Sequence, residues 1–341
     1  MSSLEFVASL TVCPSDIRKI CDNLNLASPK HDPLKNILIT PLFANKGSLN
    51  QVQEMSEAGR RVMFDSGGYY VQTGRITYEA LFYPLLEVYQ SHPWASTYVL
   101  PDHVPTSQDA ADLVEYKVRS TARTSRLFFE HLSEDLKRRA MPVVHGHNIR
   151  QIDVCLETYL AMGVKQIGFG SFGTIGNKSE VNIASEGTVR LARYVIEVAH
   201  QHGIRVHLFG LGVPALAAMI KGIGADSFDS SSWLKSAGFG QVFLPFMRAH
   251  NITYKTDVSE LQLGIKESTF QTLRRLTRHE CALCRSLDDL RAKKMHRAVH
   301  NLIVLAETIH QINQGDMEPI RYIYKNGSVK YRNEIEKWLP N

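Results

Sequence analysis

Short apolar segments recur along the 341-residue chain, and each is followed by a stretch in which apolar residues have helical spacing. Segments of this length suit buried strands, and strands that alternate with helices favour a parallel sheet. We count eight such segments, at 36–44, 62–68, 97–105, 141–147, 165–173, 205–212, 225–230 and 241–246. The sequence therefore predicts an α/β protein folded as a (β/α)8 TIM barrel, with a doubly wound open sheet as the alternative.

The composition fits this class of fold. A length of 341 residues suits one barrel domain over residues 1–341, and an apolar content of 44% is ordinary for a globular core. The formal net charge of +5 permits a polyanionic partner without requiring one. The first residues lack the plan of a signal peptide, no apolar run could span a membrane, and five cysteines suggest no disulfide framework. We therefore expect a cytoplasmic protein that does not associate with membranes.

Polar and glycine-rich residues follow the predicted strands. In a barrel of this kind, chemistry is located at the carboxyl ends of the strands. The residues at those ends are Asp65, Asp102, His145, Gly168 with Gly170, and Asp229. We expect them to share one rim of the barrel and to form a site there.

The stretch Asp65-Ser66-Gly67-Gly68 stands out because it follows an apolar run directly and precedes two tyrosines. Glycines allow backbone angles, or a close ligand approach, that a side chain would forbid. Two interpretations are open at this point. The stretch is either a tight turn with a solvated aspartate or the wall of a site for a flat polar molecule.

A second cluster lies beyond the last predicted strand. His279, Cys281 and Cys284 are three ligand-type side chains within six residues, and His300 follows, with His296 and His310 as rivals for the fourth position. Two thiolates and two imidazoles suit tetrahedral zinc in a closed, structural site. We predict a small zinc-binding subdomain near the C-terminus, inserted in the barrel at residues 266–300.

The same region is rich in basic residues: Arg274, Arg275, Arg278, Arg285, Arg291, Lys293, Lys294 and Arg297. A charge run of this kind is either a solvated face or a phosphate-binding surface. Of these residues, Arg274, Arg275, Arg278, Lys293 and Lys294 are the candidates for phosphate contacts.

Several motifs together resemble one known family. "FDSGGYY", "FGLGVPALAAMIKGIGADSFDSS", "HECALC" and "HNLIVLAETIHQINQG" resemble, in order, motifs of the tRNA-guanine transglycosylase superfamily. The similarity extends from about residue 37 to residue 315. Within that superfamily the chain most resembles the DNA-guanine transglycosylases of 7-deazaguanine DNA-modification systems, since it is compact and no RNA-binding domain follows the barrel.

The resemblance implies a (β/α)8 barrel that exchanges a guanine for a 7-deazaguanine without breaking the phosphodiester chain. Asp229 then matches the nucleophile and Asp65 the general acid/base. The zinc ligands match His279, Cys281, Cys284 and His300, and the Asn-Leu that follows His300 favours it over its rivals.

Base-binding roles follow in the same way. Ser66 and Gly67 match residues that line the base pocket, Tyr69 matches an aromatic residue that stacks on the base, and Asp102 matches the carboxylate that reads its Watson–Crick edge.

The chain departs from the family pattern at three places. His279 replaces a cysteine, His145 stands where an amide would read the base, and Gly168-Phe169-Gly170 replaces Gly-Gly-Leu. These departures leave the chemistry possible and put base and polynucleotide selectivity in doubt. The expected partners are DNA or tRNA and a free 7-deazaguanine base. A homodimer is compatible with this assignment, and the alternative to an enzyme is a noncatalytic partner that docks nucleic acid.

Overall fold

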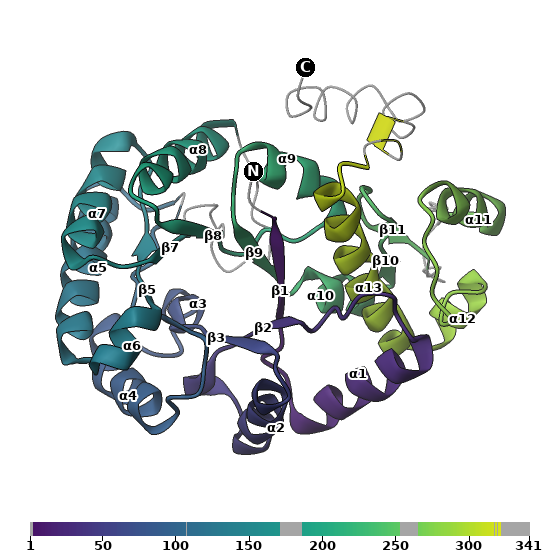
Figure 1. Ribbon diagram of the computed structural model, residues 1–341, viewed down its shortest axis with the longest axis horizontal. Helices are drawn as coiled ribbons and strands as arrows, with labels where there is room; N and C mark the ends of the chain where they lie inside the picture. The colour runs from purple at the N-terminus through teal and green to yellow at the C-terminus, as the bar shows by residue number, and fades with distance from the viewer. Residues whose placement is uncertain are drawn as a thin grey trace.

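The computed structural model describes residues 3–106, 108–170, 186–252, 265–316, 318, 320 and 321. Its centre is one nine-stranded sheet in which all neighbouring strands are parallel, in the order β5-β4-β3-β2-β1-β9-β8-β7-β6 (Figure 1). The strands are β1 (Glu5–Ser9), β2 (Asn36–Ile39), β3 (Arg61–Phe64), β4 (Thr97–Val99), β5 (Ala140–Met141), β6 (Val143–Val144), β7 (Gln166–Phe169), β8 (Arg205–Leu208) and β9 (Ser227–Ser230).

The sheet curls into a nearly closed barrel because its two outermost strands are consecutive in the chain. Only Pro142 separates β5 from β6, and proline has no backbone N–H to donate to a ladder. The Pro142 carbonyl still accepts a hydrogen bond of 2.9 Å from the Gly168 backbone N–H. The expected segment 141–147 is therefore two short strands, and the described sheet has nine strands rather than eight.

Two expectations about the strands were wrong. Residues 241–246 do not belong to the barrel, because β10 (Gln241–Val242) pairs antiparallel with β11 (His250–Asn251) in a separate sheet. The strand that the sequence analysis missed is β1, which lies between β2 and β9. The final three residues of the expected strand 165–173 lie outside the described residues.

Helices follow the strands and cover the outside of the barrel. Those assigned are α1 (Pro14–Ala27), α2 (Lys46–Glu57), α3 (Gly68–Gln72), α4 (Tyr78–Ser91), α5 (Ala111–His131), α6 (Glu134–Arg139), α7 (Ile149–Met162), α8 (Glu186–Gln201), α9 (Ala217–Gly222), α10 (Ser232–Gly238), α11 (Glu267–Leu276), α12 (Leu287–Ala292) and α13 (Lys294–Asn313). Figure 1 shows α4 to α8 outside the ring of strands, with α11 and α12 beyond α13. Among the described helices, none has the length and apolar character needed to cross a membrane.

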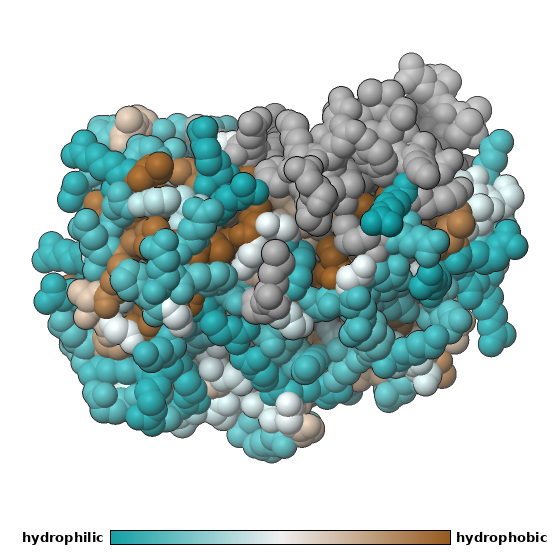
Figure 2. All heavy atoms as spheres, turned by 45° about the horizontal axis from the view of Figure 1, so that its top comes forward, coloured by the Kyte–Doolittle hydropathy of each residue, from teal (hydrophilic) through white to brown (hydrophobic). Residues whose placement is uncertain are grey.

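Side chains alternate along each barrel strand between two apolar layers. The outward-facing residues, such as Phe6, Ile37 and Phe64, belong to the large core shared with the helices. The inward-facing residues form a second, small core: Val7, Leu38, Met63, Val99, Met141 and Val143. The barrel interior is therefore filled, and any binding site lies at its ends. The face drawn in Figure 2 is mainly hydrophilic where it is coloured, with hydrophobic side chains in patches.

Helix α13 is joined by buried and partly buried hydrogen bonds to the segment 233–243 and to the start of β1. The fully buried Asn301 accepts a hydrogen bond of 2.7 Å from the Phe243 N–H and donates to the carbonyls of Trp233 and Gln241. At the end of the same helix, Asn313 bonds both the N–H and the carbonyl of Leu4, just before β1. The segment 241–246 is apolar because it is buried beneath this helix.

We predict that Asn301→Leu destabilises the protein by about 3 kcal/mol or more. The change keeps the volume but removes three hydrogen bonds, one from the buried Phe243 N–H and two to the carbonyls of Trp233 and Gln241, and each costs about 1 kcal/mol, with more for the N–H left unpaired. Chemical denaturation followed by circular dichroism measures the loss. The control is Asn25→Leu on the exposed side of α1, which should change stability by less than about 0.5 kcal/mol. Equal losses in the two variants would contradict the role given to Asn301.

Candidate functional site

Asp229 lies on β9 at the carboxyl-end rim of the barrel and is almost fully buried. Its Oδ1 accepts a hydrogen bond of 2.7 Å from the Gly210 backbone N–H, and its Oδ2 accepts one of 2.9 Å from the Ser9 hydroxyl. His207 Nε2 lies 3.4 Å from Oδ1. The partners come from the ends of β1 and β8, the two strands beside β9. Donors on both oxygens suit a charged carboxylate that is held in one orientation.

Asp65 directly follows β3 on the same rim and is partly exposed. Its Oδ2 accepts hydrogen bonds from the Thr40 hydroxyl at 3.0 Å and from the Gly67 N–H at 3.3 Å. The pKa of Asp65 is raised to about 7 despite these bonds. The largest cause is removal from water, and repulsion from Asp102 and Asp229 adds to it. A carboxyl with this pKa can both give and take a proton near neutral pH.

Asp102 forms a buried network three residues after the end of β4. Its Oδ1 accepts a bond of 2.6 Å from the Ser66 hydroxyl, and its Oδ2 lies 2.8 Å from His145 Nε2. His145 is fully buried (0% exposed), so its ring contacts Asp102 rather than solvent at the rim. In this geometry His145 holds Asp102, whereas the sequence analysis expected it to stand where an amide reads a base.

Glycines let this network form. A Cβ on Gly68 would lie 2.6 Å from Asp102 Oδ1, and one on Gly170 would lie 2.4 Å from His145 Cε1. Real Cβ atoms do not approach other atoms so closely. Gly67 also has a φ of +90°, in the left-handed region that favours glycine. Gly68 therefore lets the backbone lie close to Asp102, and Gly67 lies close to Phe43 in the same way, so the buried Gly-Gly pair is not an ordinary solvated turn.

Two aromatic side chains border the same rim. Tyr69 lies on α3 with 52% of its surface exposed, and the Lys235 ammonium lies 5.8 Å from its ring centroid. Phe209 follows β8 and packs against β7, where a Cβ on Gly168 would lie 2.2 Å from its ring. Tyr69 is thus free to contact a ligand, and Gly168 makes room for Phe209.

The structure brings the predicted site residues together on one rim: Asp65, Ser66, Gly67, Asp102, His145, Gly168, Gly170 and Asp229, with Tyr69 on the adjoining helix. It also adds Ser9, Thr40 and His207, which the sequence analysis missed. Their positions at or near strand ends are the one signal that could have identified them. Ser9 was out of reach because β1 itself was not predicted.

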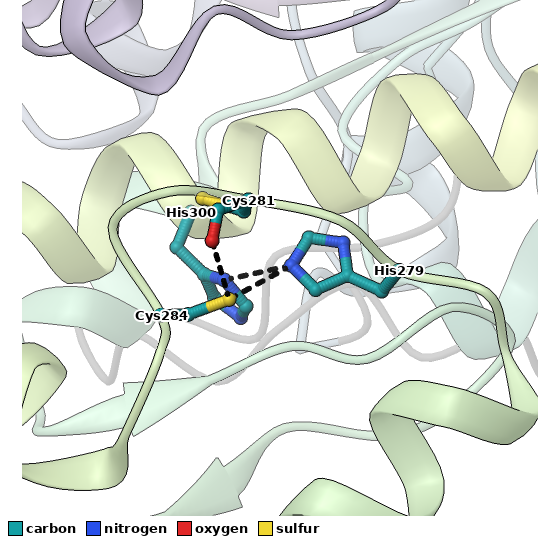
Figure 3. Close-up of side chains that lie close together, drawn as sticks. All are labelled: His279, Cys281, Cys284 and His300. Atoms are coloured by element: carbon teal, nitrogen blue, oxygen red, sulfur yellow. Dashed lines mark hydrogen bonds between the residues drawn. The ribbon is translucent and has the colours of Figure 1, made fainter.

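The second cluster gathers four buried side chains near the start of α13. The ligand-type atoms of His279, Cys281, Cys284 and His300 all lie within 4.8 Å of one another (Figure 3). His279 Nε2 is 3.1 Å from His300 Nδ1 and 3.3 Å from Cys284 Sγ. Tetrahedral coordination with metal–nitrogen bonds of about 2.0–2.1 Å would place two nitrogens roughly 3.3 Å apart. These residues can therefore bind a metal ion.

The outer nitrogens of both imidazoles are also bonded. His279 Nδ1 lies 2.6 Å from Glu307 Oε2, and His300 Nε2 lies 2.9 Å from the Phe243 carbonyl. Such partners fix the tautomer and orientation of metal-ligating histidines. His300, rather than His296 or His310, completes the cluster. The ring of His310 instead stacks on His31, with centroids 3.7 Å apart.

The basic segment divides into two groups. Arg274 donates to the His279 carbonyl, and Arg278 forms ion pairs with Asp316 and Glu318. Arg291 and the buried Arg297 donate to backbone carbonyls. Among the eight basic residues of this segment, the exposed ones without an ion pair to the described part of the chain are Arg275, Arg285, Lys293 and Lys294. Arg274 and Arg278 therefore have structural partners and are poor candidates for phosphate contacts.

The chain was also compared with known proteins. It matches no protein-family model, and a search of curated proteins found no significant match. The assignment of function therefore depends on the residues of the rim and on the sequence motifs.

We predict that Asp65→Asn raises the melting temperature relative to the wild type at pH 8 and leaves it unchanged at pH 3. The pKa of Asp65 is higher in the folded protein (about 7) than its ordinary value of 3.8. Raising the pH through this window therefore favours the unfolded state of the wild type, while the amide does not titrate. Differential scanning calorimetry at both pH values measures the change. A stabilisation independent of pH would contradict the raised pKa.

We predict that Glu307→Gln weakens metal binding by about 10- to 100-fold, because the variant loses the carboxylate that orients His279. Competition with a chromophoric chelator measures the affinity, starting from protein that contains about one metal ion per chain. The control is Glu280→Gln, next to Cys281 in sequence, whose carboxylate is exposed and pairs with Lys30 at 2.7 Å. An affinity equal to that of the wild type in Glu307→Gln would rule out this role.

Proposed function

We propose that the protein is a guanine transglycosylase that replaces a guanine in DNA with a 7-deazaguanine, 7-cyano-7-deazaguanine in particular. One observation carries the proposal. Asp229, with hydrogen-bond donors on both oxygens, shares a barrel rim with Asp65, whose pKa is about 7. A fixed carboxylate beside a carboxyl that exchanges protons at neutral pH is the pair that base exchange requires.

The reaction has two displacements at C1′ of the sugar. In the first, a carboxylate oxygen of Asp229 bonds to C1′ as the C1′–N9 bond breaks, and the bonding electrons leave with guanine. Asp65 gives that guanine a proton. In the second, Asp65 takes a proton from the incoming base, whose nitrogen bonds to C1′ as the aspartyl ester breaks. The two inversions retain the original configuration.

Asp102 and the rim residues around it bind the base in this proposal. A carboxylate can accept two hydrogen bonds from the N–H groups on the Watson–Crick edge of guanine. Ser66 bonds one oxygen of Asp102 and His145 bonds the other, which fixes the orientation of the carboxylate. Tyr69 supplies an exposed ring for stacking. A target base in duplex DNA must first be flipped out, at a cost of a few kcal/mol.

Two finer features belong to the same proposal. We count β5 and β6 as one strand interrupted at Pro142, which gives the eight strands of a (β/α)8 barrel. We assign the ion of the second cluster as structural zinc, because a set of two thiolates and two imidazoles suits tetrahedral zinc. The zinc would tie the loop that carries His279 to α13 and takes no part in catalysis.

The choice of DNA rests on the motif resemblance described above, and tRNA is the alternative polynucleotide for the same chemistry. Exposed cations of the zinc region, Arg275 and Lys293 among them, are available for the phosphates of either. A noncatalytic docking subunit is disfavoured because Asp65, Asp102 and Asp229 are all retained and grouped on one rim.

We predict that the wild-type protein incorporates radiolabelled guanine into DNA and that Asp229→Asn does not. The amide has nearly the same shape, but it cannot form the glycosyl ester. Filter binding of the labelled polynucleotide measures incorporation, with DNA and tRNA tested in parallel. Melting temperature and DNA affinity should be close to wild type in the variant.

The outcomes of this experiment separate the alternatives. Incorporation into tRNA alone would show that the substrate is tRNA and not DNA. Incorporation into neither would favour the docking subunit. Turnover by Asp229→Asn at the wild-type rate would remove Asp229 from the nucleophile role.

A further inference from the structure

His207 is a buried histidine that neither the motifs nor the mechanism above assigns to a role. It lies on β8 with its side chain inside the barrel, and 2% of it is exposed. Its Nε2 is 3.4 Å from Asp229 Oδ1, and its Nδ1 is 2.8 Å from the Ser227 hydroxyl. Its ring also packs edge-on against Phe209, with the centroids 4.6 Å apart. The imidazole is therefore held from three sides, with one nitrogen directed at the candidate nucleophile.

The direction of these bonds follows from the groups involved. A carboxylate oxygen only accepts, so Nε2 must carry the proton that is donated to Asp229. The Ser227 hydroxyl can then donate to Nδ1, which fixes this tautomer. The distance of 3.4 Å is long, but hydrogen bonds at catalytic sites often shorten when the substrate complex forms.

The two oxygens of Asp229 have different partners. Oδ1 faces two nitrogen donors, the Gly210 backbone N–H and His207 Nε2, while Oδ2 faces the Ser9 hydroxyl. A hydroxyl can turn its proton away, whereas a backbone N–H cannot. In an ester, the carbonyl oxygen is the better acceptor. The oxygen with two fixed N–H donors is therefore suited to become the ester carbonyl, and Oδ2 is suited to attack.

Resting on the function proposed above, we infer that His207 is a positioning residue that selects Asp229 Oδ2 as the nucleophilic atom and assists departure of the carboxylate in the second displacement. When the C1′–Oδ2 bond breaks, its electron pair returns to the carboxylate and the incoming nitrogen bonds to C1′. The negative charge that develops is shared between the two oxygens of Asp229. The hydrogen bond from His207 to Oδ1 therefore becomes stronger. The donor thus stabilises the carboxylate more than the ester.

This role predicts an asymmetric effect on the two half-reactions. Without the donor, Asp229 is no worse as a nucleophile but is a poorer leaving group. In His207→Phe, ester breakdown should slow by about 10-fold, the effect of one hydrogen bond to a charged group. Ester formation should change little, so the covalent protein–DNA adduct should accumulate at steady state. His207→Gln restores an N–H at a similar reach and should recover most of the breakdown rate.

The test measures the two steps separately on the full-length protein. Target DNA is incubated with each variant without free base, and the adduct is quantified on a denaturing gel. Excess guanine is then added, and the rate of adduct loss is followed. Ser227→Ala keeps the His207 ring and removes the hydroxyl at Nδ1. Ser227→Ala should also slow ester breakdown, by a smaller factor than His207→Phe. It replaces His207→Phe in the test if that variant does not fold.

Each result decides the matter. Slow breakdown with near-normal formation, recovered by His207→Gln, supports the inference. Equal slowing of both steps would show a merely structural role and overturn it, as would wild-type breakdown in His207→Phe and Ser227→Ala. If the wild-type protein forms an adduct and incorporates guanine, those results count against His207 alone. If it does neither with DNA or tRNA, the proposed function itself is rejected.

Discussion

Parallel pairing of every neighbouring pair of strands in the central sheet is the constraint from which the rest of this structure follows. Because all of its strands run the same way, their carboxyl ends meet on one rim, and residues hundreds of positions apart become neighbours. Ser9 reaches Asp229 in this way at 2.9 Å. The alternation of side chains then decides which residues face inward, and the inner apolar layer closes the barrel beneath the rim. The polar side chains that face inward, such as His207 and Asp229, lie next to this layer on the side of the rim.

The fold and much of the candidate site could be predicted because their signals are local. Strands β2 to β9 each overlap an apolar segment seen in the sequence, with β3 and β5 starting one residue earlier. The errors share one physical cause, since burial makes a segment apolar whatever its conformation. Residues 241–246 are apolar beneath α13, outside the barrel sheet. Strand β1 was missed because it is only five residues long and its three central residues are buried on both faces, so it shows no alternation of apolar and polar residues.

Side-chain roles were harder to predict than positions. A sequence shows that His145 follows a strand, but it does not show whether the ring faces a ligand or a neighbouring carboxylate. The ring of His145 faces Asp102 because Gly170 leaves room for it and the Asp102 carboxylate bonds it. Both of these residues lie at the ends of other strands. His207 and Thr40 gave no spacing signal, because single residues on separate strands meet only when the barrel closes. The candidate metal site was predictable because three of its four residues, His279, Cys281 and Cys284, lie within six positions of the sequence.

The place of β1 has a consequence for how this protein is made. Val7 pairs with Asp229, and Leu4 is bonded on both sides by Asn313. At about 5–20 residues per second, the ribosome needs roughly 10–45 s to travel from Val7 to Asp229. During that interval the first strand of the barrel has neither of these partners. Strand β1 is thus among the last strands to gain all of its partners, and until then its edge toward β9 is open to a chaperone.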